Sequence, residues 1–288
     1  MLITFKTSEI FFCSNNLRSI DVMKLQNVNP VISKEKFYQE QLDSMQDMME
    51  RTTAYMEELQ EELNEAKHAL QEKHDQLLES VNYAAKIQNL LLPDHKFFSD
   101  HFKDYYWHVN QRDRIGGDFV YYKEDGDLVY FGLFDCTGHG VPGSLLAIMG
   151  HTLLEEAFFH FTQPSTKQIM NSVNEGFQQF FKMDETDIQD GMEGVLCVLN
   201  KKTNQLNVTS AGRPIVIKQN GAWELIKRDP KSIGGRVSNT FEEKIFSLAP
   251  NDEIFIFSDG LVDQFGGDRD KKFLIRRVMA GLRNEKHD

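Results

Sequence analysis

The sequence predicts an α+β protein in which antiparallel sheets are flanked by helices and preceded by a long coiled-coil helix. Three observations predict this class. Apolar residues recur every seven positions over about 35–92, short apolar runs separated by turn residues follow Pro93, and two longer segments with helical spacing interrupt those runs. We therefore divide the chain into a weakly structured segment 1–32, a coiled-coil or linker helix 33–92 and a folded domain 93–288.

The seven-residue repeat predicts a left-handed coiled coil, and with it a homodimer. Lys73 and Ser80 stand at intervening positions where apolar side chains are expected. This leaves open a second interpretation, a single long helix that folds back on the domain. Pro93 is expected to end the helix. The repeat consists of Leu42, Met49, Met56, Leu63, Leu70, Leu77, Ala84 and Leu91.

Beyond Pro93 the chain alternates between extended and helical patterns. Turn residues at 124–127 and at Asn220-Gly221 separate apolar runs, as in hairpins. Helical spacing covers 142–161 and 165–181. No glycine pattern of the Walker or dinucleotide-binding type is present. The extended segments are 106–109, 119–122, 128–134, 195–199, 206–210, 215–218 and 254–257.

The composition is that of an ordinary acidic globular protein. Of 288 residues, 40% are hydrophobic and 26% charged, and the formal net charge is −12. Nucleic-acid binding relies on clustered Lys and Arg, so this balance argues against it. Every apolar run is shorter than the roughly 18 residues of a membrane span, so we expect no membrane insertion. Three cysteines without zinc-type spacing favour a reducing compartment, and we expect a cytoplasmic protein.

Two aspartates stand at the ends of apolar strands. Asp135 ends the run 128–134, and Asp259 follows the run 254–257. Burying an unpaired carboxylate costs several kcal/mol, so two such strand ends indicate a shared cation. Asp118, Asp190 and Asp263 are further candidates. Oxygen-only donors select Mg²⁺ or Mn²⁺, and two such ions about 3.5–4 Å apart can activate a shared water for phosphoryl hydrolysis.

Each motif also has an ordinary structural explanation. Gly116-Gly117-Asp118 is a common turn, and Ser258-Asp259-Gly260 is equally common as a turn or helix cap. His139 is better explained as a turn residue than as a metal ligand, because the other candidates are hard oxygen donors. Cys136 is expected to be a small buried apolar residue. The prediction of a metal site therefore rests on the occurrence of all these motifs in one sequence.

The combination resembles the SpoIIE/RsbU-type branch of the metal-dependent PPM serine/threonine phosphatases. The resemblance covers about residues 80–278. Its motifs, in order, are Gly117-Asp118-Phe119, Asp135-Cys136-Thr137-Gly138-His139-Gly140-Val141-Pro142-Gly143, Asp190-Gly191-Met192, Ser210-Ala211-Gly212, Ser232-Ile233-Gly234-Gly235 and Ser258-Asp259-Gly260-Leu261-Val262-Asp263-Gln264-Phe265-Gly266-Gly267.

The resemblance implies a PPM-type β-sandwich flanked by helices, with two Mn²⁺ or Mg²⁺ ions at one end. Asp135 would bridge both ions, Cys136 would contribute its backbone carbonyl, Asp259 would hold one ion and Asp118 would ligate or orient waters on the other. Asp263 and Asp190 match nearby motif positions and are candidates for indirect ligands or a third ion. The family's usual substrate is a phosphoserine or phosphothreonine on an anti-sigma-factor antagonist.

One departure from the family pattern concerns the last strand. The family pattern ends with an Asp-Asp pair leading into a core strand, and the sequence 271–288 shows neither. Loss of that strand would expose a sheet edge and weaken one metal site. Two hypotheses follow: a phosphatase that acts through a metal-bridging water, and a catalytically impaired relative that serves as a binding or regulatory module.

Overall fold

The computed structural model describes residues 30–93, 95–111, 113–181, 190–234, 240–266 and 270–284. The chain divides into two compact units, Met1–Lys73 and His74–Asp288. The expected weak structure over 1–32 lies outside the described residues, except that the first helix already begins at Pro30.

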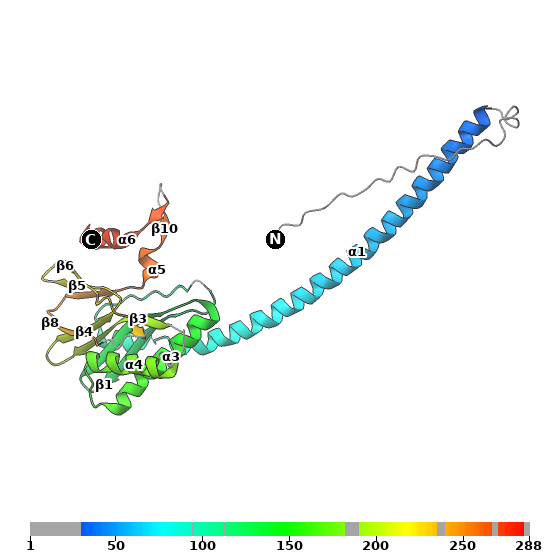
Figure 1. The fold of residues 1–288 in the computed structure, drawn as a ribbon. Coiled ribbons are helices and arrows are strands. Elements are labelled where there is room, and N and C mark those ends of the chain that lie inside the picture. Colours follow the sequence, from blue (N-terminus) through cyan, green and yellow to red (C-terminus); the bar gives the residue numbers. More distant parts are fainter. Residues whose placement is uncertain are drawn as a thin grey trace, which may run out of the picture. The chain divides into compact units, whose positions relative to one another are not determined.

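The first helix, α1 (Pro30–Asn89), is continuous over 60 residues (Figure 1). Its only proline is at the first position, where a missing backbone N–H is tolerated, and it contains no glycine. Polar side chains support it through contacts four residues apart, such as Gln39 to Asp43 at 3.2 Å and Arg51 to Asp47 at 2.9 Å. The helix ends four residues before Pro93, slightly earlier than expected.

A six-stranded antiparallel sheet forms the centre of the second unit. Its order is β1-β2-β3-β4-β8, and β7 pairs with β3. The β1–β2 hairpin turns at Gly126, whose φ of 62° lies in the left-handed region that favours glycine. The strands are β1 (Asp118–Asp125), β2 (Leu128–Cys136), β3 (Gly191–Asn200), β4 (Gln205–Ala211), β7 (Ile233–Gly234) and β8 (Glu243–Ser247).

A second, three-stranded sheet has the order β6-β5-β9. Its hairpin turns at Asn220 and Gly221, with φ of 52° and 78°, which matches the twist of the paired strands. The strands are β5 (Ile215–Gln219), β6 (Ala222–Ile226) and β9 (Glu253–Ile256). Ile215 and Ile217 share one buried cluster with Val129 and Phe131 of β2. The two sheets therefore pack face to face as a β-sandwich.

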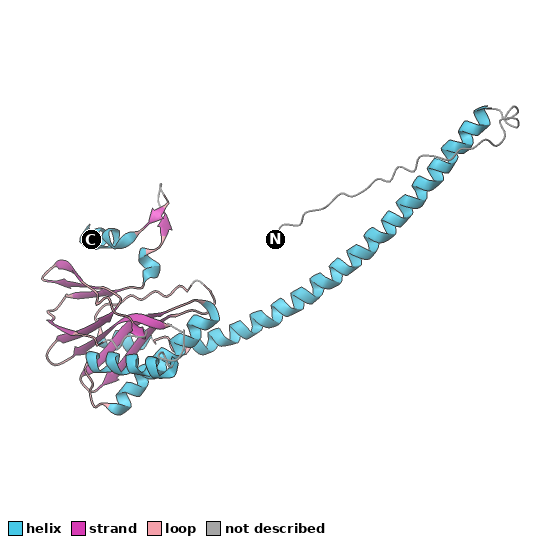
Figure 2. Ribbon diagram, viewed as in Figure 1, coloured by secondary structure: helices cyan, strands magenta, loops and turns pink. Residues whose placement is uncertain are grey.

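Helices cover the opposite face of the larger sheet (Figure 2). They are α3 (Gly140–His160) and α4 (Thr166–Phe181). In β2, Tyr130 and Phe134 pack against the helices, whereas Val129 and Phe131 face the second sheet. This alternation follows from the two-residue period of a strand and explains why β2 reads as one continuous apolar run.

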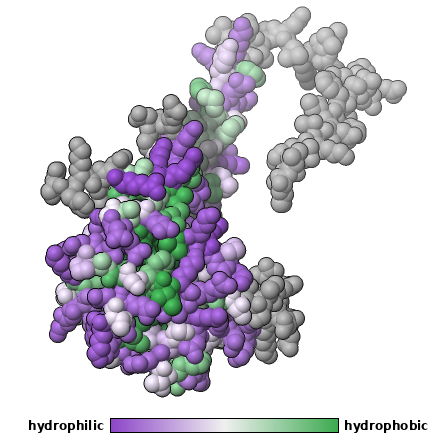
Figure 3. Space-filling view, turned by 90° about the vertical axis from the view of Figure 1, so that its left-hand side faces the viewer, coloured by the Kyte–Doolittle hydropathy of each residue, from purple (hydrophilic) through white to green (hydrophobic). Residues whose placement is uncertain are grey.

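The C-terminal part consists of short elements and one amphipathic helix. These are α5 (Asp259–Val262), β10 (Phe265–Gly266), β11 (Lys271–Lys272) and α6 (Leu274–Asn284). Met279 of α6 shares a buried cluster with Val216 and Phe257. Another short helix, α2 (His95–His101), places Phe97 against the buried cluster between the two sheets that contains Val129 and Ile215. Figure 3 shows one face of the molecule, on which hydrophilic side chains surround a narrow apolar strip.

The expected α+β class, both later helices and six of the seven extended segments are confirmed. The expectation for 106–109 is wrong, since these residues belong to no strand. Strands β6, β7, β8, β10 and β11 were not expected, because they are short or carry charged residues that break the apolar pattern. Among the described residues, no helix is long and apolar enough to cross a membrane.

Replacement of Gly194 by alanine tests the packing of β2 against β3. A Cβ at Gly194 would lie 2.3 Å from a ring carbon of Phe134 and 2.8 Å from the carbonyl oxygen of Leu133. We expect Gly194→Ala to lower the free energy of unfolding by about 1–3 kcal/mol in urea denaturation. The control is Gly281→Ala in α6, where nothing lies within 4 Å and alanine favours the helix. Equal stability of the two variants would contradict this packing.

Candidate functional site

Two of the expected aspartates face each other across the first hairpin. Asp118 is the first residue of β1, and its register partner in β2 is Asp135. The side chain of Asp135 is 17% exposed. Burial, followed by the charge of Asp118 and a hydrogen bond with it, raises the pKa of Asp135 to about 8, although Arg213 acts in the opposite direction. The pair therefore holds a proton when no other cation balances it.

Glycines allow the backbone to close tightly around this pair. A Cβ at Gly117 would lie 2.7 Å from the carbonyl oxygen of Cys136, and one at Gly143 would lie 2.7 Å from that of Gly138. The segment before β1, the turn after β2 and the start of α3 thus meet at main-chain distance. This contact explains the glycines at these positions of the sequence.

Asp259 joins the pair from the far end of the domain's sequence. It begins α5, directly after Ser258, whose hydroxyl donates a 3.0 Å hydrogen bond to Oδ2 of Asp118. Oδ2 of Asp259 lies 3.0 Å from a guanidinium nitrogen of Arg213, which also pairs with Asp135. The structure therefore brings Asp118, Asp135 and Asp259 to one place.

Arg213 is a site residue that the sequence analysis missed. Its side chain is 13% exposed and forms ion pairs with Asp135, Asp259 and Glu193. Burial lowers the pKa of Arg213, but the charges of Asp135 and Asp259 outweigh it, so the pKa is raised and the guanidinium stays charged. The sequence feature that could have indicated Arg213 is its position directly after the Ser210-Ala211-Gly212 motif.

The loop between β4 and β5 is shaped to present Arg213. Gly212 has φ of 72°, and a Cβ there would lie 2.5 Å from Cδ of Glu193. Its N–H donates to the carbonyl of Asp229 at 2.8 Å, and its own carbonyl accepts from Arg228 at 3.0 Å. The Ser210 hydroxyl donates to the carbonyl of Arg213. The loop is thus anchored on both sides of the arginine.

The other expected residues have different contacts. Asp263 pairs with Lys272 at 2.9 Å, outside the three-aspartate contact network described above. Asp190 accepts a 2.9 Å hydrogen bond from the hydroxyl of Thr137, in the turn after β2. Nδ1 of His139, the residue before α3, lies 3.0 Å from Oδ2 of Asp113. Burial raises the pKa of the Cys136 thiol, as expected of a buried apolar residue.

The C-terminal end of α1 holds the backbone that leads into Asp118. The side-chain amide of Gln88 donates to the carbonyl of Gly116 at 2.6 Å, and its oxygen accepts from the N–H of Gly116 at 3.2 Å. Gln111 donates to the carbonyl of Asp118 at 3.1 Å. The side chain of Gln88 is buried, and the backbone of Gly116 supplies a hydrogen-bond partner to both the nitrogen and the oxygen of its amide.

The donor chemistry of this site fits a hard divalent cation. Asp118, Asp135 and Asp259 offer only carboxylate oxygens, which Mg²⁺ and Mn²⁺ prefer. Across the described part of the chain, no three His, Cys, Asp or Glu side chains are spaced as a ready-made cation cage. Arg213, which contacts two of the three aspartates, supplies the positive charge there.

Comparison with known proteins decides the family. The family model "Stage II sporulation protein E (SpoIIE)" matches residues 125–288, more than half of the chain. The chain belongs to the SpoIIE family. No curated protein sequence matches this SpoIIE-family chain.

Solved structures show the fold of this SpoIIE-family chain. It is similar to the SiaA-PP2C domain of Pseudomonas aeruginosa, with 24% identity, a TM-score of 0.67 and coverage of 74% of this chain and 83% of that one. A further match is the PP2C phosphatase domain with a regulatory fragment of SpoIIE from Bacillus subtilis, with 16% identity, a TM-score of 0.48 and coverage of 60% and 49%. Another is RsbX in complex with magnesium, with 15% identity, a TM-score of 0.43 and coverage of 61% and 83%. The domain therefore has the fold of the SiaA-PP2C domain.

The raised pKa of Asp135 predicts a pH dependence of stability without metal. Because the folded state retains a proton that the unfolded chain releases above about pH 3.9, the unfolded state binds fewer protons and stability falls as pH rises toward 8. We expect a loss of about 1 kcal/mol per pH unit between pH 5 and 7.5, measured by urea denaturation with chelator. Asp135→Asn removes this titration, and its curve should be flatter than that of the parent chain. Parallel curves would contradict the prediction.

Proposed function

We propose that this chain is a metal-dependent protein phosphatase that hydrolyses phosphoserine or phosphothreonine at the Asp118, Asp135 and Asp259 site. The observation that carries the proposal is the convergence of these three carboxylates, from β1, β2 and the start of α5, in a domain of the SpoIIE family. The hydrogen bond between Ser258 and Asp118 joins residues 140 positions apart in the chain at this site.

The proposed cofactor is a pair of Mn²⁺ or Mg²⁺ ions. Asp135 would contact both ions, Asp118 and Asp259 one each, and the Cys136 carbonyl and Asp263 would complete the set. Two such ions supply a Lewis acid for the phosphoryl oxygen and an activated bridging water as the nucleophile. Oδ2 of Asp263 pairs with Lys272 at 2.9 Å, so the other carboxylate oxygen of Asp263 would be the ligand.

The residues of the chain itself orient the ligands and release a proton. Ser258 and Gln111 hold the side chain and the main chain of Asp118, and Gln88 holds the backbone two residues earlier. Because the raised pKa keeps a proton on Asp135, cation binding has to displace that proton, and binding should strengthen as pH rises toward 8. The site thus couples cation binding to proton release.

The proposed substrate is a phosphorylated signalling protein of the anti-sigma-factor antagonist type, in the cytoplasm. The motif resemblance and the family membership support this class of substrate. The described cysteines, Cys136 and Cys197, are both buried free thiols, in keeping with a reducing compartment. The competing hypothesis is a catalytically impaired relative that binds phosphoproteins, and the pairing of Asp263 with Lys272 is the observation that favours it.

Replacement of Asp135 distinguishes these two functions. We expect the purified chain to hydrolyse an aryl phosphate with Mn²⁺ and to lose activity with chelator. Asp135→Asn should lower the rate by about 100-fold or more, since it removes the central carboxylate with little change in volume. Asp127→Asn, in the β1–β2 turn where Asp127 pairs with Lys202, is the matched control and should keep the parent rate. No metal-dependent turnover by the folded parent chain would favour the binding module.

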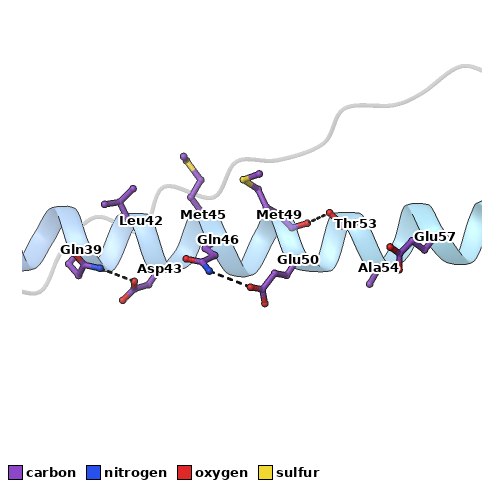
Figure 4. Close-up of a pocket in the computed structure, with 10 residues that line it drawn as sticks. All are labelled: Gln39, Leu42, Asp43, Met45, Gln46, Met49, Glu50, Thr53, Ala54 and Glu57. Atoms are coloured by element: carbon purple, nitrogen blue, oxygen red, sulfur yellow. Dashed lines mark hydrogen bonds between the residues drawn. The ribbon is translucent and has the colours of Figure 1, made fainter.

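We propose further that the chain forms a homodimer through the repeat of α1. The repeat side chains from Leu42 to Leu77 are exposed on α1, between 56% for Leu42 and 72% for Leu70, whereas Ala84 and Leu91 are half-buried. Figure 4 shows Leu42, Met45 and Met49 on one side of the helix, and Gln39, Asp43, Gln46 and Glu50 on the other, where hydrogen bonds join them in pairs. An uncovered apolar stripe with this period matches the seam of a second copy.

Charges placed in the stripe test the dimer. Leu63→Asp with Leu70→Asp should convert a dimer into a monomer in sedimentation-velocity ultracentrifugation, because carboxylates cannot be buried in the seam. The matched control adds the same two charges one residue later, as Asn64→Asp with Gln71→Asp, and should remain dimeric. If the parent chain sediments as a monomer, or if the seam variant remains a dimer, the stripe has another role.

A further inference from the structure

We propose that Arg213 is a built-in cation that competes with divalent metal for the aspartate site, so that metal binding requires its guanidinium to leave. The inference rests on the proposed metal site and adds a regulatory residue to it. Arg213 would set the metal concentration at which the site fills.

The contacts place the guanidinium on the acidic side chains that a cation would use. Its Nη2 pairs with Oδ2 of Asp135 and lies 3.0 Å from Oδ2 of Asp259, while its Nε lies 3.0 Å from Oε2 of Glu193. Asp118 adds a fourth carboxylate through its contact with Asp135. A single arginine therefore bridges carboxylates from β2, β3 and α5.

Charge explains why the arginine occupies this position. Four carboxylates with one guanidinium leave the site with a net negative charge. Opposite charges at hydrogen-bond distance attract strongly in a partly buried site, so the carboxylates bind whichever cation is available. A divalent cation bound to Oδ2 of Asp135 and Oδ2 of Asp259 would lie within a few Å of the guanidinium and be repelled by its charge. The two cations therefore compete for these oxygens.

The hydrogen bonds that anchor the loop would remain if the Arg213 side chain left the site. The anchors of the loop are main-chain contacts of Gly212 with Asp229 and Arg228, and the hydroxyl contact of Ser210. None of these contacts involves the Arg213 side chain. Its side-chain torsions can therefore change while the backbone stays in place.

Metal-binding calorimetry on the full chain tests the proposal. After chelator treatment, Mn²⁺ is titrated into the parent chain, Arg213→Met and Arg213→Lys, with circular dichroism as a check on folding. We expect Arg213→Met to bind Mn²⁺ about tenfold or more tightly, because it removes one competing unit charge at similar volume. Arg213→Lys keeps the charge but loses the fork that reaches three carboxylates, and its affinity should be intermediate. Arg277→Met, an exposed arginine of α6, controls for net charge and should match the parent.

The outcomes separate this inference from the proposed function. If the parent chain binds Mn²⁺ and Arg213→Met binds no more tightly, Arg213 does not compete and only this inference is overturned. If neither the parent chain nor any variant binds Mn²⁺, the metal site itself fails and both the inference and the proposed function are overturned. Should Arg213→Met be unfolded without metal, the comparison of Arg213→Lys with the parent decides, and equal affinities would overturn the inference.

Discussion

The site depends on the register of one hairpin. With Asp118 and Asp135 opposite each other in β1 and β2, two carboxylates are held side by side where β1 begins and β2 ends. Like charges in this position are unfavourable, so the fold has to supply a proton, an arginine or a metal ion. A shift of the register by one residue would separate the pair and would also turn Tyr130 and Phe134 away from the helices. Core packing and site geometry are thus determined together.

The remaining site contacts follow from closing the sandwich over this hairpin. Packing β5 against β2 brings the β4–β5 loop, and with it Arg213, to the same end of the sheet as Asp135. Pairing β9 with β5 brings Ser258 and Asp259 there as well. Gln88 adds a contact from the end of α1. Changes at the end of α1 or in the β4–β5 loop therefore act on the same two carboxylates.

Much of the fold was predictable because its signals are local. The heptad repeat, the absence of glycine and proline in α1 after Pro30, and the apolar runs of β1 to β5 each lie within a few residues of one another. Strands such as β8, with Glu243 and Lys244, lack that local signal, since they form by pairing with β4. The segment 106–109 shows the opposite case, an apolar run that finds no partner strand.

For the site, the sequence by itself determined the candidate aspartates, the oxygen-donor chemistry and the family pattern. A carboxylate at the end of an apolar run can be recognised from the order of residues alone. Only the tertiary structure decided which of them meet: Asp118, Asp135 and Asp259 do so, while Asp263 pairs with Lys272. It also revealed Arg213, whose partners lie on three different elements. The physical reason is that an ion pair depends on the distance between two side chains in space. The neighbours of a residue in the sequence do not indicate which distant residues sheet packing will place beside it.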